Sequence, residues 1–214
     1  MRNTEKDEAQ MAARRELMLD NGFRLFAENG IEPVAMQQVA KECGLGIATL
    51  YRYYNTKLSL VIDIGTRKWL QFGEYIKKLQ IERDTAHMTA AKELEFYLDC
   101  YIILYTERKA LLRFNQDFNN YVRNEGVSQA QLKSYLEAIG SYAAMFHGVY
   151  EKGKRDGTIR TELSEDKMFA ATSHIMLAVA VRYAQGLVWA AGSESDRTEE
   201  YKLLKRMILR EFVV

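Results

Sequence analysis

A short run of polar and aromatic residues in the first third of the chain carries the side chains best suited to binding chemistry. In order, it contains Thr49, Tyr51, Arg52, Tyr53 and Lys57. Hydroxyl groups, a guanidinium and an ammonium group all donate hydrogen bonds, and phosphate oxygens and base edges accept them. We therefore expect a nucleic-acid contact surface here. The alternative for the two tyrosines is that they are simply exposed aromatic residues, and for Lys57 that it is an ordinary surface lysine.

The elements around this run follow the pattern of two short helices joined by a sharp turn, over about residues 35–54. Apolar residues at helical spacing would bury one face of each helix and leave the polar run exposed. Gly44 stands at the turn, where a positive φ favours glycine. In a helix-turn-helix, the second helix enters the DNA major groove and the first crosses the backbone. Ile47 begins the second helix and completes the residues expected to face DNA.

Four blocks of sequence then carry a resemblance to a known family. They are FAENG at residues 26–30, VAKECGL at 39–45, ATLYRYY at 48–54 and KLSL at 57–60. In this order and at these separations they resemble the DNA-binding domain of TetR-family transcriptional regulators. The resemblance covers about the first third of the chain. It implies a homodimeric regulator, usually a repressor, that binds a palindromic double-stranded DNA operator and responds to a small-molecule effector.

Some positions depart from the usual pattern of that family. Val34 and Ala35 stand where Thr or Ser is common, Gly46 where Ser often caps the recognition helix, and Leu58 where an acid is frequent. Because Val34 and Ala35 have no hydroxyl group, the cap and phosphate contact usual at that position is in doubt.

Composition favours a helical protein but gives the DNA prediction no support of its own. The chain has 214 residues with one proline, and its formal net charge is +1. Residues 1–57 hold eight Lys and Arg against eight Asp and Glu, a net charge of zero. The DNA prediction therefore depends on the motif. Arg14 and Arg15 are interpreted as part of a solvated helix face, with a phosphate contact as the alternative.

The remaining chemistry-bearing residues predict neither a metal site, nor a cofactor, nor an enzyme. Cys43 and Cys100 are far apart and lack a ligand pattern, so we expect reduced packing residues in a cytoplasmic protein. His87, His147 and His174 are separated from one another in sequence. There is no nucleophile motif and no Gly-rich phosphate loop. The N-terminus has no apolar core typical of a secretory signal, and residues 168–191 are too interrupted by polar groups for a membrane span.

The expected fold is all-α with about nine helices in two domains. Residues 1–72 form the DNA-binding domain and residues 73–214 the effector-binding and dimerisation domain. Turn and capping residues predict one helix over 9–28 and the next from Asn55 or Thr56 to the polar break at 82–85. A helix over 87–106 is followed by a shorter one that ends at Tyr121. The later helices are expected from Ser128 to 154, from Ser164 for about 26 residues, and over 198–212.

Aromatic residues concentrate in the second domain and suggest a binding site for an apolar or aromatic effector. The candidates are Trp69, Phe72, Tyr97, Tyr101, Tyr105, Phe118, Tyr142 and Phe146. Tyr97, Tyr101 and Tyr105 repeat every four residues, so their hydroxyl groups share one helix face and would need partners if buried. A cavity holding water or ligand would satisfy them, and a wet outer face is an equal alternative. A regulator of the same fold with no effector remains the rival function.

Two apolar stripes near the C-terminus predict the dimer interface. They contain Ile175, Val179 and Tyr183 in the penultimate helix and Leu204 and Ile208 in the last. Either stripe could instead be internal core. The penultimate helix is apolar around most of its circumference, which favours burial against a second copy of the chain.

Overall fold

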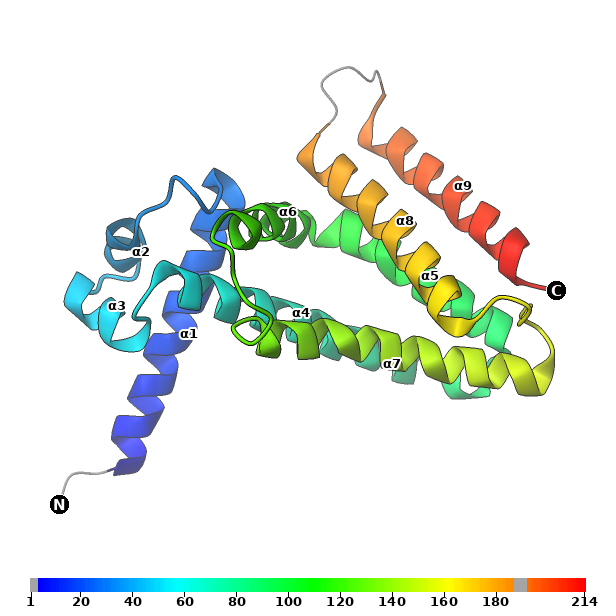
Figure 1. Ribbon diagram of the computed structural model, residues 1–214, viewed down its shortest axis with the longest axis horizontal. Helices are drawn as coiled ribbons and strands as arrows, with labels where there is room; N and C mark the ends of the chain where they lie inside the picture. Colours follow the sequence, from blue (N-terminus) through cyan, green and yellow to red (C-terminus); the bar gives the residue numbers. More distant parts are fainter. Residues whose placement is uncertain (1–3, 187–191) are drawn as a thin grey trace. The chain divides into compact units, whose positions relative to one another are not determined.

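The computed structural model describes residues 4–186 and 192–214, and within these ranges the chain is helical with no β-strand (Figure 1). In chain order its helices are α1 (Thr4–Asn29), α2 (Met36–Glu42), α3 (Ile47–Tyr53), α4 (Lys57–Glu82), the short 3-10 helix η1 (Thr85–His87), α5 (Ala90–Glu107), α6 (Lys109–Asn124), α7 (Lys133–Asp156), α8 (Glu165–Gln185) and α9 (Glu194–Phe212). An isolated antiparallel bridge joins Ile159 to Val213. The predicted all-α class is confirmed.

The helices group into two compact units. Unit 1 comprises the described residues up to Lys68 together with Phe114–Glu137, and unit 2 comprises Trp69–Arg113 and Ala138–Val214. Unit 1 thus contains α1, α2, α3, the first half of α4 and most of α6. This division concerns packing; the functional boundary expected at residue 72 stays a prediction.

Unit 1 has its own apolar core, which holds the helix-turn-helix against α1 and α4. The side chains that are completely buried in it include Met18, Phe26, Val39, Leu50, Leu60 and Ile64. Gly22 of α1 brings the helices close, since a Cβ atom there would lie 2.9 Å from the Cδ1 atom of Ile64 in α4. The chain turns after α1 at Gly30, and α4 is capped by Thr56, whose hydroxyl accepts a hydrogen bond of 3.1 Å from the Ser59 amide. Both boundaries were predicted.

Residues 114–137 complete unit 1 by packing against α4. Phe118 stacks on Tyr135 at 4.3 Å between ring centroids, and the Tyr135 hydroxyl donates to Asn115 at 2.9 Å. Gly65 of α4 fits under both rings, because a Cβ atom there would lie 3.2 Å from Tyr135 and 3.3 Å from Phe118. Phe118 was predicted to line the effector site with residues of the second domain. Its ring packs in the core of unit 1, and a role of Phe118 in effector binding stays a prediction.

In unit 2, α5 packs against both α8 and α9, which also contact each other (Figure 1). The buried face of α5 includes Leu94, Leu98 and Leu104. Lys205 of α9 binds Asp99 of α5 at 2.8 Å and Glu95 at 3.3 Å. The Tyr201 hydroxyl donates to the Met176 carbonyl of α8. Apolar packing and polar contacts together hold these three helices. None of the described helices combines the length and apolar character that a membrane crossing requires.

The starts of α9 and α7 differ from the predicted ones, and the start of α8 agrees with its prediction. α9 begins at Glu194 rather than 198, because Ser193 and Asp196 form a capping box with a bond of 3.2 Å from the Asp196 amide to the Ser193 hydroxyl. Ser128 and Gln131 do bond to each other, yet the regular helix α7 starts only at Lys133. Ser164 occupies the N-cap position of α8, but its side chain accepts no capping bond. The final residues predicted for that helix lie outside the described part of the chain.

Candidate DNA-binding surface

The turn between α2 and α3 has the conformation that the sequence predicts. Gly44 has a φ of 64°, in the left-handed region, and a Cβ atom there would meet nothing within 4 Å. The Leu45 amide donates back to the Ala40 carbonyl at 2.9 Å, which satisfies one of the last carbonyl groups of α2. A residue with a Cβ atom would fit in space but would strain the backbone at this position.

The outward face of α3 carries donors with no partner in the described chain. Leu50 is completely buried, whereas Tyr51 is 44% exposed and Arg52 is also exposed. Thr49 and Tyr53 are half-buried. Within residues 4–186 and 192–214, these four polar side chains make no hydrogen bond or ion pair. Their donors are therefore available to an external partner. Ile47 is half-buried at the first position of α3.

Lys57, the fifth candidate donor, already has a partner. Its ammonium group donates to the Glu32 carbonyl at 2.9 Å and lies 5.5 Å from the centre of the Tyr121 ring and 6.0 Å from that of Phe26. Burial lowers the pKa of Lys57, while the charges of Glu32 and Glu125 oppose this effect. A phosphate contact by Lys57 stays a prediction, and it requires the side chain to leave the Glu32 carbonyl.

A buried polar group at the end of α3 fixes the direction of this helix. The Tyr54 hydroxyl donates to the Asp63 carboxylate of α4 at 2.6 Å, and the Arg15 guanidinium of α1 binds the same carboxylate at 2.7 Å. Burial, and then the hydrogen bond to Asp63, raise the pKa of Tyr54. Arg24 of α1 forms an ion pair with Glu42 of α2. Arg15 is therefore engaged with Asp63, a partner 48 positions away that sequence spacing did not reveal.

In unit 2 the predicted effector residues form several groups instead of one. Trp69 lies 6.3 Å from Phe72 and 5.8 Å from Tyr142 between ring centroids, and the Tyr142 hydroxyl donates to the Trp69 carbonyl. Tyr105 contacts Tyr183 at 5.7 Å. The other pairs are Phe146 with Phe169, and Tyr97 with Phe96 and Gln80. Of the predicted effector residues, Trp69, Phe72 and Tyr142 therefore contact one another, and their role in effector binding stays a prediction.

The tyrosine hydroxyl groups of α5 have unusual surroundings. Burial raises the pKa of Tyr97 and Tyr101, yet both side chains keep some surface that water can reach. The Tyr105 hydroxyl is fully buried and has no hydrogen-bond partner among the described residues. The charge of Tyr101 also contributes to raising the pKa of Tyr142 and Tyr201, although burial is the main cause for each.

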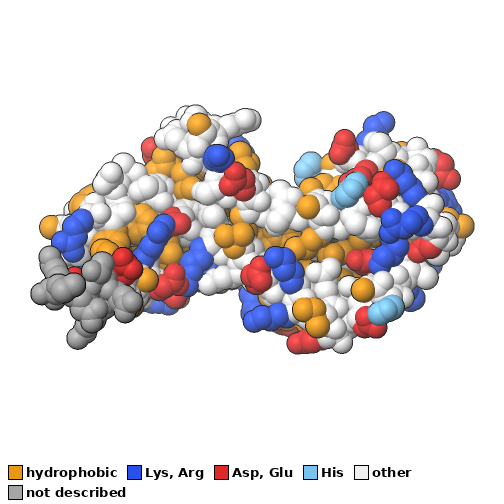
Figure 2. Space-filling model, turned by 90° about the horizontal axis from the view of Figure 1, so that it is seen from below, with side chains coloured by type: hydrophobic (Ala, Val, Ile, Leu, Met, Phe, Trp, Pro, Cys, Tyr) orange, Lys and Arg blue, Asp and Glu red, His pale blue; other side chains and the backbone are white. Residues whose placement is uncertain are grey.

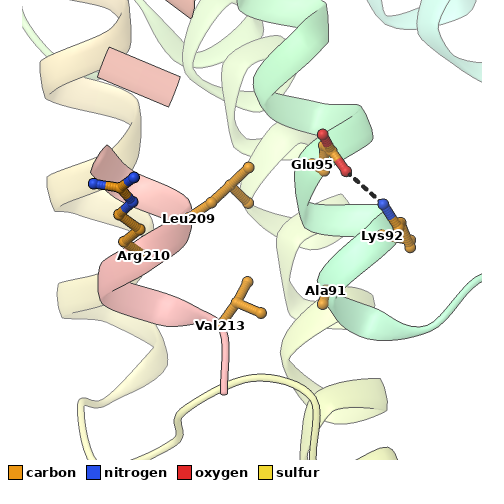
Figure 3. Close-up of a pocket in the computed structure, with 6 residues that line it drawn as sticks. All are labelled: Ala91, Lys92, Glu95, Leu209, Arg210 and Val213. Atoms are coloured by element: carbon orange, nitrogen blue, oxygen red, sulfur yellow. Dashed lines mark hydrogen bonds and ion pairs between the residues drawn. The ribbon is translucent and has the colours of Figure 1, made fainter. Parts of the chain in front are cut away.

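A surface hollow of about 430 Å³ lies elsewhere in unit 2, between the start of α5 and the end of α9 (Figure 3). Its lining residues are Ala91, Lys92, Glu95, Leu209, Arg210 and Val213. Leu209 and Val213 point toward α5, Arg210 points away from it, and Lys92 bonds to Glu95 at 3.0 Å. None of the predicted effector residues lines this hollow.

Comparison with known proteins identifies the family. The model of the bacterial regulatory proteins of the tetR family matches residues 18–64, which include α2, α3 and the start of α4. A curated HTH-type transcriptional regulator of Staphylococcus aureus strain MRSA252 is 28% identical over 150 residues, covering 70% of this chain and 72% of the relative. Residues 18–64 therefore carry the DNA-binding domain of the TetR family, and the chain is similar to TetR-family regulators. This supports a DNA-binding transcriptional regulator, and DNA recognition by α3 stays a prediction.

Solved structures share the fold of this TetR-family regulator along nearly its whole length. A TetR transcription regulator from Haloarcula marismortui superposes with a TM-score of 0.74 at 15% identity, covering 95% of this chain and 100% of that one. The transcriptional regulator FadR from Bacillus subtilis, solved in complex with stearoyl-CoA, has a TM-score of 0.67 at 17% identity, covering 91% of this chain and 95% of that one. At such identities the likeness concerns the fold.

The residues predicted for the dimer interface of the regulator differ in their surroundings. Ile175 is 44% exposed, and Val179 and Leu204 are half-buried. The Tyr183 hydroxyl donates to Glu200 at 2.6 Å. Ile208 is only 7% exposed, so its side chain already packs within its own chain. Sequence periodicity missed Leu203 and Met207 of α9, which are 51% and 58% exposed.

Charge is mixed on the one face of the molecule that Figure 2 draws. On the face drawn in Figure 2, the basic and acidic side chains are interspersed. The formal net charge of +1 agrees with this distribution. The DNA contacts predicted for α3 would then act locally, without a large excess of positive charge on the protein.

Proposed function

We propose that this TetR-family regulator is a homodimeric repressor that binds a palindromic operator through α3 and is released by a small apolar or aromatic effector. The exposed, unpartnered donors of α3 are the observation that carries the DNA part of this proposal. Arg52 reads a base, because a guanidinium group binds guanine through two parallel hydrogen bonds in the major groove. Tyr51, Tyr53, Thr49 and Lys57 contact the backbone, which fixes the register of the helix.

The operator is an inverted repeat whose half-sites are separated by one turn of the double helix. A two-fold dimer presents two copies of α3, and successive major grooves are roughly 34–36 Å apart. Selection from a random double-stranded DNA library with the purified protein tests this directly. An inverted repeat is the expected result. Enriched sequences without any repeat would refute binding as a two-fold dimer.

Two variants separate base reading from general charge. Arg52→Ala should relax base preference at one position in each half-site, with a loss of about 1–3 kcal/mol on the preferred sequence. Arg24→Ala is the control, because it removes the same charge from unit 1 but lies on α1 beside Glu42. It should leave base preference unchanged. If Arg52→Ala kept both affinity and preference at fixed salt, the assignment of base reading to Arg52 would be wrong.

The effector part of the proposal rests on the aromatic residues around α5 in unit 2. Tyr97 and Tyr101 are buried enough to raise their pKa while retaining accessible surface, and Tyr105 has a buried hydroxyl without a partner. Such groups suit a ligand that is mostly apolar with one or two polar atoms. FadR, which shares the fold, was solved with stearoyl-CoA, a ligand with a long apolar chain.

Release of the operator tests this part. Stearoyl-CoA and a series of smaller aromatic acids serve as probes, added to the protein bound to its selected operator. Tyr101→Trp should block release by filling the interior, while Tyr75→Trp, at a half-buried site on α4, should not. If no probe releases the operator or binds the free protein, the rival function, a regulator without an effector, is favoured.

A further inference from the structure

Three side chains that are distant in sequence meet on the surface of unit 2. His147 and Glu151 lie on α7, and Glu165 is the first residue of α8. One nitrogen of His147 and one carboxylate oxygen from each glutamate all lie within 4.8 Å of one another. The closest pair is Nδ1 of His147 and Oε2 of Glu165, at 2.9 Å. The three side chains thus present one imidazole and two carboxylates toward one point.

Well-packed neighbours hold the three side chains in place. His147 and Glu151 are four residues apart, so they share one face of α7. Between them, the buried Tyr150 donates its hydroxyl to the Leu163 carbonyl at 2.7 Å, which fixes the linker just before Glu165. The ring of Phe146, next to His147, packs on Phe169 of α8 at 5.4 Å. Both the start of α8 and this face of α7 are therefore anchored in the core of unit 2.

The donor atoms select the class of ligand. Zn²⁺ and similar divalent transition metals accept imidazole nitrogen and carboxylate oxygen, whereas Ca²⁺ and Mg²⁺ prefer oxygen ligands alone. Metal–ligand bonds of about 2.0–2.2 Å require the donors to approach to roughly 3.3 Å, which small side-chain rotations achieve from the present spacing. Glu151 would have to release Lys154, now 2.7 Å away. That exposed ion pair contributes little to stability.

We propose that His147, Glu151 and Glu165 bind a divalent transition-metal ion such as Zn²⁺, which joins α7 to α8. Water completes the coordination, since the chain supplies three ligands. The ion adds a link between two helices of the domain proposed to bind effector and to form the dimer. Sequence spacing predicted no metal site, because Glu165 reaches His147 only through the path of the linker between α7 and α8.

Cobalt titration of the full-length protein, after removal of metals with a chelator, tests the site. Co²⁺ should bind at one ion per chain and give visible absorption, and Zn²⁺ should displace it. His147→Gln and Glu165→Gln should each abolish the absorption. Glu151→Gln should lower affinity at least about tenfold, because loss of even an outer-shell partner has an effect of that size. Thermal melts should show Zn²⁺ raising the Tm of the wild type but not of His147→Gln or Glu165→Gln, since the ion binds the folded state.

His87→Gln is the matched control. His87 is exposed and bonds to Asp84 at 2.7 Å, so it has the same kind of carboxylate partner but belongs to no three-ligand group within the described residues. It should bind Co²⁺ like the wild type. Circular dichroism of each variant establishes that it is folded. Absence of Co²⁺ and Zn²⁺ binding by the wild type, or equal binding by folded His147→Gln and Glu165→Gln, would overturn the proposal.

Discussion

Arg52 and Tyr54 are two residues apart, and their polar groups differ in whether they have a hydrogen-bond partner within the described chain. The Arg52 guanidinium has no partner in the described chain, whereas the Tyr54 hydroxyl is held by Asp63 and the Arg15 guanidinium lies 3.3 Å from it. A recognition helix needs both kinds of residue. Free donors bind the partner, and satisfied buried groups prevent the helix from rotating. We therefore expect Tyr54 to influence DNA binding through the orientation of α3.

The two cysteines are expected to be unreactive in the folded protein. Cys43 is 8% and Cys100 is 4% exposed, and burial raises the pKa of both thiols, that of Cys100 to about 12. At pH 8 a pKa of about 12 leaves roughly one thiolate in ten thousand thiols, and the thiolate is the reactive form. Ellman's reagent should find no thiol in native protein and two per chain after denaturation. Rapid reaction of either thiol in the native state would contradict this.

At the scale of elements, two glycines in α7 should respond oppositely to the same change. A Cβ atom at Gly148 meets nothing within 4 Å, so Gly148→Ala should stabilise the protein by up to about 1 kcal/mol through helix propensity. At Gly153 the Cβ atom would lie 3.0 Å from the Cβ atom of Ile159, a branched position close to the backbone. Gly153→Ala should therefore destabilise. Urea denaturation measures both, and equal shifts in the two variants would show that the Ile159 contact is not restrictive.

Because of the ionic contact between α5 and α9, the free energy of unfolding should depend on pH in the acidic range. The hydrogen bond from Lys92, and then that from Lys205, lower the pKa of Glu95. A carboxylate whose pKa is lower in the folded state stabilises the protein above its unfolded pKa, about 4.3, and this contribution is lost as pH falls through the folded value. Lys205→Met keeps the packing but removes the charge.

The free energy of unfolding measured with urea should then differ between the wild type and Lys205→Met by roughly 0.5–1 kcal/mol at pH 7, because the carboxylates are partly solvent-screened. The difference should shrink below pH 4. Lys202→Met, on an exposed face of α9 beside Glu199, is the control and should change stability less. A difference for Lys205→Met that is the same at both pH values would rule out the ionic origin.

Local sequence signals predicted most helix boundaries, and long-range packing decided what they missed. Gly30, Gly44 and Thr56 act through their own backbone or their next turn, so their effects can be read from neighbouring residues. The Ser193–Asp196 capping box is also local, although the predicted last helix begins only at 198. The bond between Arg15 and Asp63 depends on how distant helices pack. Periodicity alone could not supply it.

The predicted sites likewise follow from the sequence only where local helical spacing decides them, and not where long-range packing does. The outward face of α3 follows from helical spacing, since the core side of a short helix leaves only one face free. The grouping of the aromatic residues of unit 2 was not predictable, because which rings meet depends on how distant helices pack. In the sequence, Phe118 and Trp69 are both large aromatic residues with nothing to separate them. The structure places Phe118 in unit 1, where it stacks on Tyr135.

At the scale of the whole molecule, the exposed apolar residues of α8 and α9 should decide the oligomeric state. Ile175, Leu203 and Met207 are each at least 44% exposed, and water contact at such side chains is unfavourable unless a second copy covers them. In a two-fold interface one substitution appears twice. Ile175→Asp would place an unpaired charge in each half of the interface, which costs several kcal/mol per buried charge.

Light scattering at micromolar concentration should therefore show a dimer for the wild type and a monomer for Ile175→Asp. Operator affinity should fall with it, because one chain reaches only one half-site. Leu70→Asp is the matched control, since Leu70 is 50% exposed but lies on α4. It should stay dimeric and bind the operator normally. A wild-type monomer would refute the dimer itself, while a dimeric Ile175→Asp would move the interface away from α8.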